Sequence, residues 1–189
     1  MEITIFGKGN MGSAIGKNFE EAGNNVKYYD SETHPDHLGE IVILAVPYPA
    51  LKKIAQTYHD QLRDKIVVDI TNPVNFDTFD SLVVPADSST AQELQILLPE
   101  SKVLKAFNTN FAATLQTGKV GNTQTIVLVA GDDENAKTTF MDALSESPLA
   151  IMNAGKLKRA RELEATGFLQ MTLASSEQIT WNGGFGVNH

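Results

Sequence analysis

MEITIFGKGNMGSAIG, residues 1–16, joins a predicted strand to a glycine-rich turn and the beginning of a predicted helix. Ile3–Phe6 is a short apolar run, and Gly7, Gly9 and Gly12 follow it in the spacing G-x-G-x-x-G. After the glycines, apolar residues recur at helical spacing. A strand that passes through such a turn into a helix is typical of the first unit of a doubly wound α/β fold.

The rest of the chain repeats this alternation of strand and helix. Further apolar runs of strand length, rich in Ile and Val, lie at Val26–Tyr29, Ile41–Val46, Lys65–Ile70, Val103–Phe107, Ile126–Ala130 and Leu149–Asn153. Helical patterns separate most of these runs, and one of them begins at a capping box, Thr90–Glu93. Continuous apolar strands that alternate with helices predict a parallel, doubly wound Rossmann sheet.

The link between the second and third predicted strands is unusually short. Only SETHPDHLGE, residues 31–40, separates them, and a proline interrupts it. Ten extended residues reach roughly 33 Å, which is enough to return along a strand of about 20 Å. We therefore predict a sheet that is pruned after the second strand and lacks one helix and one strand of the first half.

The C-terminal part is predicted to be a helix and a tail. We divide the chain into a dinucleotide-binding Rossmann domain, residues 1–155, and a C-terminal extension that packs on it, residues 156–189. Gly167 interrupts the helical pattern at a cost of about 1 kcal/mol relative to alanine, which predicts close approach of another backbone or a ligand. The face with Phe168 and Met171 packs on the chain's own sheet, covers a substrate crevice or buries a homodimer contact, and the sequence does not choose among these.

Composition limits the classes of function. The chain has 189 residues, a formal charge of −8 and a pI near 4.9, so a nucleic-acid surface is not expected. It contains no cysteine and no run of 18 apolar residues, which favours a cytoplasmic protein without membrane partners. Small molecules are the expected partners.

The glycine turn predicts a dinucleotide site. Gly7 would form the tight turn, Gly9 would let a pyrophosphate approach, and Gly12 would pack the helix on the sheet. The phosphates would then meet the free amides and the positive dipole end of the helix. The other residues of this turn that we expect to contact the cofactor are Lys8, Asn10 and Met11. The alternative is a glycine-rich turn without a ligand.

The end of the second strand bears on the choice of cofactor. A carboxylate at Asp30 would bind the ribose hydroxyls and repel a 2′-phosphate, which favours NAD. Lys8, Ser31 and His34 could instead contact that phosphate, so the choice between NAD and NADP stays open here. The alternative is a solvated loop aspartate at Asp30.

Polar and proline residues follow the next three predicted strands. Val46 ends the third strand and Pro47 and Tyr48 follow it in AVPYPA (45–50), at the edge where ligands bind in open α/β sheets. Asn72 and Pro73 follow the fourth strand, and the fifth is followed by Asn108, Thr109 and Asn110. The amides could hold a nicotinamide carboxamide or a substrate carbonyl, although Asn-Pro and Asn-Thr also begin ordinary turns.

Taken in order, these motifs resemble the F420-dependent NADP oxidoreductase family. The resemblance is carried by IFGKGNMGSAIG, AVPYPAL, KIVVDITNP, KAFNTNFA, VAGDDENAK, NAGKLKRARELE and WNGGFG, which extend over nearly the whole chain. It implies hydride exchange between NADPH and a flavin-like, deazaflavin or other small acceptor, with the nicotinamide beside Val46, Pro47 and Tyr48. Members that prefer NADP tend to carry Ser or Thr with Arg after the second strand, whereas this chain has Asp30-Ser31-Glu32.

No obligatory acid or base is expected if a ring accepts the hydride, because the cofactors then carry the chemistry. A carbonyl acceptor would need a proton donor, for which Tyr48 is the first candidate. Tyr48 and Lys52 also form a Tyr-x-x-x-Lys pattern, but Pro49 places Tyr48 ahead of the helix.

No metal is predicted. His34 and His37 lie near each other in THPDH without a third ligand cluster. The alternative to an oxidoreductase is a non-catalytic NAD(P) sensor, because binding motifs are visible in the sequence and a reaction centre is not.

Overall fold

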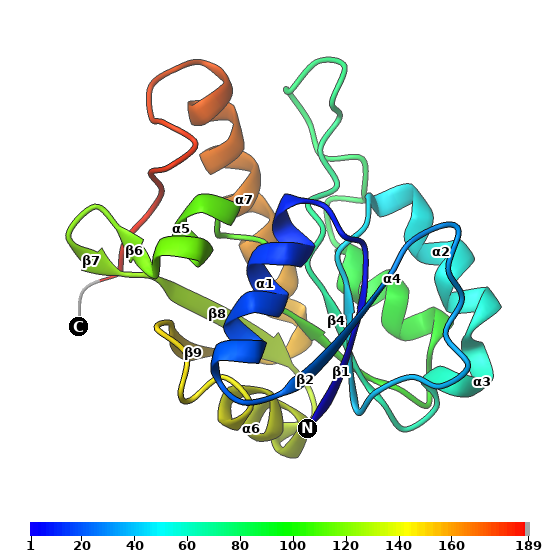
Figure 1. Cartoon of the computed structure of the whole chain (residues 1–189). Helices are drawn as coiled ribbons and strands as arrows, with labels where there is room; N and C mark the ends of the chain where they lie inside the picture. The colour runs from blue at the N-terminus through cyan, green and yellow to red at the C-terminus, as the bar shows by residue number, and fades with distance from the viewer. Residues whose placement is uncertain (188–189) are drawn as a thin grey trace.

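The computed structural model describes residues 1–187, and its centre is a seven-stranded sheet (Figure 1). The strands are β1 (Glu2–Phe6), β2 (Asn25–Tyr29), β3 (Ile41–Leu44), β4 (Ile66–Asp69), β5 (Lys102–Lys105), β8 (Ile126–Gly131) and β9 (Ala150–Gly155). They are ordered β2-β1-β3-β4-β5-β8-β9 across the sheet. Every strand predicted from an apolar run is present, with ends that shift by a few residues.

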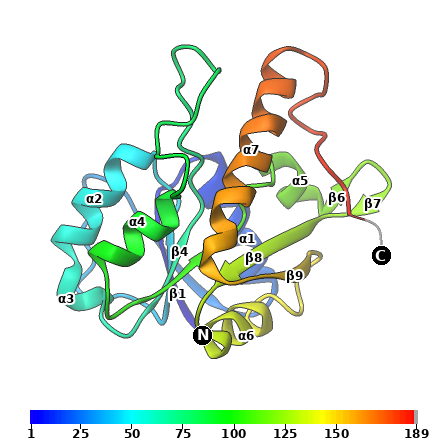
Figure 2. The ribbon, with the colours of Figure 1, turned by 180° about the vertical axis from the view of Figure 1, so that it is seen from behind.

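Helices cover both faces of this sheet (Figures 1 and 2). They are α1 (Asn10–Glu21), α2 (Tyr48–Thr57), α3 (His59–Leu62), α4 (Thr90–Leu97), α5 (Ala112–Thr117), α6 (Glu134–Asp142) and α7 (Ala160–Ser175), with a 3-10 turn η1 (Leu157–Arg159) before α7. Alternate residues of each buried strand serve two apolar cores: Ile41 and Ile43 join α1, α5 and α6, whereas Val42 and Leu44 join α2, α3 and α4. The doubly wound α/β fold is therefore confirmed.

The short link after β2 has the predicted consequence. Residues 31–40 contain neither a strand nor a helix, and β2 is the edge strand beside β1. One crossover unit of the first half of the fold is absent from this part of the chain, as the length of the link required.

The sheet is mostly parallel, and the expectation of a wholly parallel one needs correction. Strands β1 to β5 are parallel, but β8 pairs antiparallel with β5, and β9 runs parallel to β8. The connection from β5 to β8 consists of the short helix α5 and a hairpin, β6 (Lys119–Val120) and β7 (Thr123–Gln124), which the sequence did not predict. No crossover helix carries the chain back across the sheet, so β8 starts at the edge where β5 ends and runs the opposite way.

Two segments rise from the carboxyl edge of the parallel strands. They are the loop 73–88 and the C-terminal half of α7, with the tail 176–187 folded back beside it (Figures 1 and 2). The tail is attached to α7 because the backbone N–H of Phe185 donates to the Gln170 side chain over 2.9 Å, and Gln170 in turn donates to the carbonyl of Thr109.

The predicted boundary between residues 155 and 156 stays a prediction, and the last two residues of the predicted tail, 188 and 189, lie outside the described part. Within residues 1–187, no helix is both long enough and apolar enough to cross a membrane.

Candidate functional site

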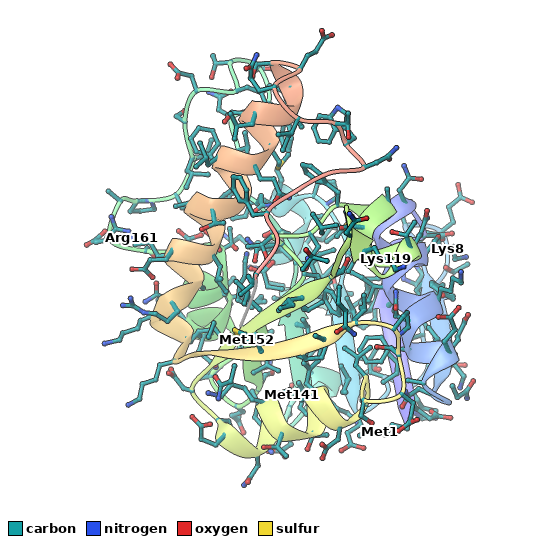
Figure 3. The ribbon with its side chains drawn as sticks, turned by 90° about the vertical axis from the view of Figure 1, so that its left-hand side faces the viewer. Met1, Lys8, Lys119, Met141, Met152 and Arg161 are labelled. Atoms are coloured by element: carbon teal, nitrogen blue, oxygen red, sulfur yellow. The ribbon has the colours of Figure 1, made fainter. Side chains whose placement is uncertain are left out.

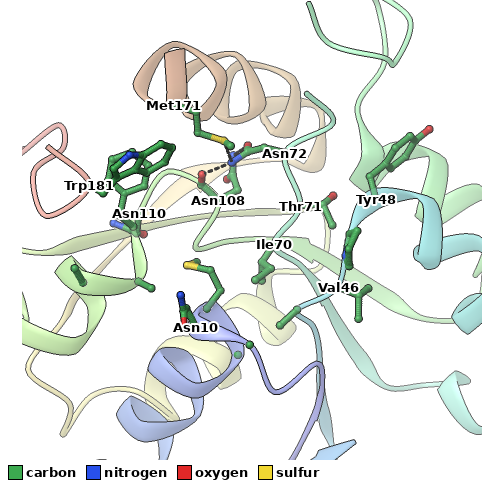
Figure 4. A pocket seen from close by; sticks show the side chains of 18 of the residues that line it. Asn10, Val46, Tyr48, Ile70, Thr71, Asn72, Asn108, Asn110, Met171 and Trp181 are labelled. Atoms are coloured by element: carbon green, nitrogen blue, oxygen red, sulfur yellow. Dashed lines mark hydrogen bonds between the residues drawn. The ribbon is translucent and has the colours of Figure 1, made fainter. Parts of the chain in front are cut away.

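A cavity of about 970 Å³ lies at the carboxyl edge of β1, β3, β4 and β5 (Figure 4). The glycine turn and α1 form its floor, and α7 and the tail lie across it. Its lining includes nine of the residues that the sequence analysis assigned to the cofactor site: Gly9, Asn10, Met11, Gly12, Val46, Pro47, Tyr48, Asn72 and Asn108.

The structure explains the absence of a side chain differently at each of the three glycines of the turn. Gly7 has φ +107°, and a β-carbon there would lie 2.1 Å from the carbonyl oxygen of Ala45. A β-carbon at Gly12 would lie 2.1 Å from the carbonyl oxygen of Gly7. At Gly9 the backbone is ordinary (φ −70°), and a β-carbon would meet no protein atom within 4 Å. Packing therefore explains Gly7 and Gly12, whereas Gly9 leaves open space beside the cavity.

The N-terminus of α1 next to Gly9 is open to an anion. No side chain caps this helix, and its first turn carries no acidic residue. In contrast, Ser89 caps α4 and Asp133 caps α6, and each of those helices has a glutamate in its first turn. The free amides and the dipole of α1 thus point at the cavity without a partner from the protein's own side chains.

Lys8 and Asp30 form an ion pair beyond the glycine turn, outside the cavity lining. The Lys8 ammonium lies 3.0 Å from Asp30 Oδ2, and Asp30 Oδ1 accepts from the backbone N–H groups of Glu32 and Thr33. These hydrogen bonds, that from Lys8 first, hold the pKa of the Asp30 carboxyl well below its usual range. The carboxylate is therefore ionised, and it already interacts with Lys8 and with backbone N–H groups at the place where the sequence predicted the adenine ribose.

Three other predicted cofactor residues lie outside the cavity lining, as Gly7 does. Ser31 is exposed, and His34 Nδ1 lies 2.9 Å from the Tyr58 hydroxyl. Pro73 is buried, and its carbonyl accepts from Val83 at the base of the loop 73–88. Across residues 1–187, no three His, Cys, Asp or Glu side chains are grouped as a metal ion would need.

Asn72 and Asn108 form a closed amide pair at the back of the cavity (Figure 4). Asn108 Nδ2 donates to Asn72 Oδ1 over 2.9 Å, and Asn72 Nδ2 donates to the carbonyl of Asn108 over 2.7 Å. Asn108 also donates to the carbonyl of Leu163 in α7. The side-chain oxygens of Asn108 and Asn110 are buried without a donor in the described part of the chain. The pair thus joins the ends of β4 and β5 to α7.

An aromatic wall on the side of α7 is the part of the site that sequence analysis missed. Phe111 and Trp181 lie with their ring centroids 5.0 Å apart, and Met171 lies beside them (Figure 4). Met171 lines the cavity, so α7 covers the crevice, which is one of the alternatives that the sequence left open. No pattern in the sequence indicates that residue 181, in WNGGFG, lies next to residue 111.

The Tyr48 hydroxyl donates to Glu93 Oε2 over 2.8 Å. Burial, this hydrogen bond and the negative charge of Glu93 raise the pKa of Tyr48 to about 12, so Lys52 does not make it a stronger acid. The Tyr48 hydroxyl proton, which a carbonyl acceptor would need, is already hydrogen-bonded to the Glu93 carboxylate. This arrangement does not favour Tyr48 as a proton donor.

A buried charged cluster lies next to the cavity wall and was not predicted. The Lys105 ammonium at the end of β5 lies 2.9 Å from Asp69 Oδ2, at the end of β4, and 2.7 Å from Glu164 Oε1, on α7. The side chains are 0 to 1% exposed. Burial raises the pKa of Glu164, and Lys105 acts in the opposite direction.

Thr90 completes this cluster. Its backbone N–H and its hydroxyl both donate to Glu164. The capping box expected at Thr90–Glu93 in fact begins one residue earlier, since the Ser89 hydroxyl accepts from the N–H of Gln92. The cluster therefore joins α4 and α7 to the two strands whose ends form the cavity wall.

Comparison with known proteins identifies relatives of the chain. The family model described as "NADP oxidoreductase coenzyme F420-dependent" matches residues 36–73. The F420-dependent NADP reductase of Methanocaldococcus jannaschii is 33% identical over an alignment of 132 residues that covers 67% of this chain and 58% of the relative. Metalloreductase STEAP3 of Rattus norvegicus is 35% identical over an alignment of 130 residues that covers 67% of this chain and 24% of the relative. The chain thus spans little more than half of the first relative and about a quarter of the second.

A solved structure shares the whole fold. A protein of Arthrobacter sp. FB24, described provisionally as an F420-dependent NADP reductase, superposes with a TM-score of 0.83 at 22% identity, covering 99% of both chains.

Proposed function

Because the chain belongs to the family of coenzyme F420-dependent NADP oxidoreductases, we propose that it is an oxidoreductase that transfers a hydride between a nicotinamide dinucleotide and a small flat acceptor such as a flavin or deazaflavin. The open space at Gly9 supports this proposal most directly. A glycine without a packing reason, at the uncapped start of α1 and facing a cavity, is what the approach of a diphosphate requires.

The residues around the turn fit such a cofactor. The amides of Asn10, Met11 and Gly12 would hold the diphosphate. The adenosine would extend toward Asp30 and Lys8, and the nicotinamide toward the end of β3 at Val46 and Pro47. The Asn110 side-chain oxygen accepts no hydrogen bond within the described part of the chain and would be the acceptor for a carboxamide N–H.

When bound, the reduced nicotinamide cofactor would supply the hydride, one proton with two electrons, which the acceptor would take up together with one proton from water. The chain's own contribution would be to position the two rings and exclude water. Met171 and the Phe111–Trp181 pair offer the surface for the acceptor ring, opposite the glycine turn. In this proposal no protein side chain has to give up a proton, which agrees with the hydrogen bond from Tyr48 to Glu93.

The preference between NAD and NADP would be decided at the Lys8–Asp30 pair. The family favours NADP, whereas a carboxylate beside the ribose repels a 2′-phosphate. The Lys8 ammonium could attract the 2′-phosphate of NADP, but its positive charge is already paired with the Asp30 carboxylate.

The decisive experiment has two stages. The purified chain is first titrated with NADPH and NADH while the fluorescence of the nicotinamide is recorded. Flavins, quinones and ferric chelates are then added, and the nicotinamide absorbance is followed. Binding followed by oxidation supports the oxidoreductase. Binding without oxidation by any acceptor supports the NAD(P) sensor instead, and absence of binding removes both.

A further inference from the structure

We propose that the acceptor taken by this chain is an uncharged aromatic ring system, and that rings carrying a phosphate tail are disfavoured. The inference rests on the proposed function, because it concerns the second substrate of the same cavity. It narrows the class of acceptor and keeps the same hydride transfer.

The lining of the cavity is neutral. All of the residues that line it lie in the described part of the chain, and none is a Lys, Arg, His, Asp or Glu. Its polar groups are amides and hydroxyls, such as those of Asn10, Gln116, Asn182 and Thr71. Such groups match the carbonyl and N–H edges of a neutral ring. Apart from the amides of the glycine turn, which the diphosphate of the cofactor would occupy, the lining offers no cation to a second phosphate, and a phosphate loses its water at a high cost when it is buried without one.

Exposed aromatic side chains border the cavity on both sides. Trp181 is 50% exposed although it is paired with Phe111, and Phe76, in the loop 73–88, is 59% exposed. Both residues line the cavity. Large rings left half in water next to a hollow provide stacking surfaces for a flat ligand, since an aromatic pair gains about 0.5–1.5 kcal/mol beyond its burial.

The two segments that carry these rings are acidic. In the loop 73–88 the charged residues are Asp77, Asp80 and Asp87, and in the tail 176–187 the charged residue is Glu177. All four side chains are exposed, and neither segment contains a Lys, Arg or His. A tail that left the cavity between these segments would pass their carboxylates. Repulsion is felt within the screening length of about 8 Å at physiological salt.

The lysines nearest in the chain to the cavity residues lie elsewhere. Lys8 is paired with Asp30 and lies beside α1, away from α7 (Figure 3). Lys52 lies on α2 and lines a separate small hollow behind Tyr48, and Lys119 lies on the hairpin that follows α5. None of these three lysines lines the cavity, and neither does Lys105, which is buried next to the cavity wall and paired with Asp69 and Glu164.

The test compares riboflavin with riboflavin 5′-phosphate, which have the same ring and differ in one phosphate. The full chain is saturated with reduced nicotinamide cofactor, and kcat/KM is measured for each ring at low and high NaCl. We expect riboflavin to be preferred roughly tenfold at low salt, equivalent to about 1.4 kcal/mol. This preference should shrink as salt screens the carboxylates.

Equal or better use of the phosphorylated ring at low salt overturns the inference and leaves the hydride transfer standing. Cofactor binding without reduction of either ring overturns the inference, and the proposed function falls with it only if no acceptor of the wider panel is reduced.

Two double variants with reversed charge test whether the carboxylates of the loop 73–88 cause the preference for riboflavin. In the double variant Asp77→Lys, Asp80→Lys we expect kcat/KM for the phosphorylated ring to rise several-fold, with riboflavin unchanged. Neither of the two aspartate side chains forms a hydrogen bond or ion pair in the described chain, so the fold should tolerate the change. The control Asp142→Lys, Glu146→Lys makes the same change of charge at exposed positions around the C-terminus of α6, at the far end of the molecule (Figure 1). An equal rise in the control, or no rise in the rim variant, contradicts the proposal.

Discussion

Gly167 of α7 lies directly against Asn72, so that a β-carbon at residue 167 would stand 2.5 Å from the Asn72 side-chain oxygen and 2.8 Å from the carbonyl of Asn108. The close approach that this glycine predicted is therefore confirmed, and what approaches is the amide pair. Through this contact α7 is placed over the cavity, where Met171 can form part of its wall.

Gly167→Ala should lower both stability and activity. Alanine is the better helix former by about 1 kcal/mol, so any loss must come from the clash with Asn72. We expect a net loss of about 1–3 kcal/mol in the free energy of unfolding and a raised KM for the acceptor. Denaturant unfolding and steady-state kinetics measure these. Thr166→Ala, one position earlier on α7, should change neither, and a stabilised Gly167→Ala variant would contradict the contact.

Gly9→Asp should abolish cofactor binding without unfolding the chain. The backbone at residue 9 is ordinary and a side chain meets no protein atom, and aspartate is a favoured N-cap. Its carboxylate would occupy the place expected for the diphosphate and repel it. Fluorescence titration with NADPH and thermal unfolding should show lost binding at an unchanged or higher melting temperature. Gly9→Ala should weaken binding less, and wild-type affinity in the aspartate variant would refute the site.

Asp30→Ala should shift the cofactor preference toward NADP. The change removes a carboxylate from the predicted ribose site and frees the Lys8 ammonium for a 2′-phosphate. We expect the ratio of the NADP to the NAD dissociation constant to fall about tenfold, or about 1.4 kcal/mol. Glu32→Ala removes the same charge two residues away and should leave the ratio nearly unchanged. A rise in the ratio for Asp30→Ala would place the ribose elsewhere.

Lys105→Met should destabilise the fold strongly and in a pH-dependent way. Removal of the ammonium leaves Asp69 and Glu164 buried without a cation, which costs about 3–5 kcal/mol. The pKa of Glu164, already raised by burial, should rise further. The folded variant then binds a proton more tightly than the unfolded chain, so its stability should increase as the pH falls from about 7 to about 5.

Unfolding in urea at both pH values checks this expectation. The control is Lys137→Met, since Lys137 is equally buried but pairs with Glu134, which is 71% exposed and can be hydrated. Its loss should be smaller and nearly independent of pH, and equal behaviour of the two variants would rule out the charged cluster as the cause.

Tyr48→Phe should leave hydride transfer to a ring acceptor within about threefold of the wild type. The hydroxyl donates to Glu93 and its pKa is raised to about 12. At neutral pH it is therefore protonated, and its proton is used in the hydrogen bond to Glu93. A general acid contributes about 10²- to 10⁴-fold to a rate. A loss of that size in stopped-flow measurements would restore Tyr48 as the proton donor and indicate a carbonyl substrate.

The sequence alone determined the local features of this protein. Each strand of the main sheet is a run of apolar residues, and the glycine turn needs only the few residues that form it, so both can be recognised without knowledge of the fold. The pruned half-sheet followed in the same way, because a link of ten residues has no room for a helix and a strand.

Only the tertiary structure decided the pairings between distant residues. Lys105 meets Glu164 across 59 positions of the chain, and Phe111 meets Trp181 across 70, with no periodicity to indicate either pair. The antiparallel direction of β8 likewise depends on where the connection through α5 and the hairpin returns the chain to the sheet. No pattern within a strand encodes that position. The glycine turn is local and was visible in the sequence. The aromatic wall of the cavity is assembled from a loop, a helix and the tail, so it exists only once packing has brought them together.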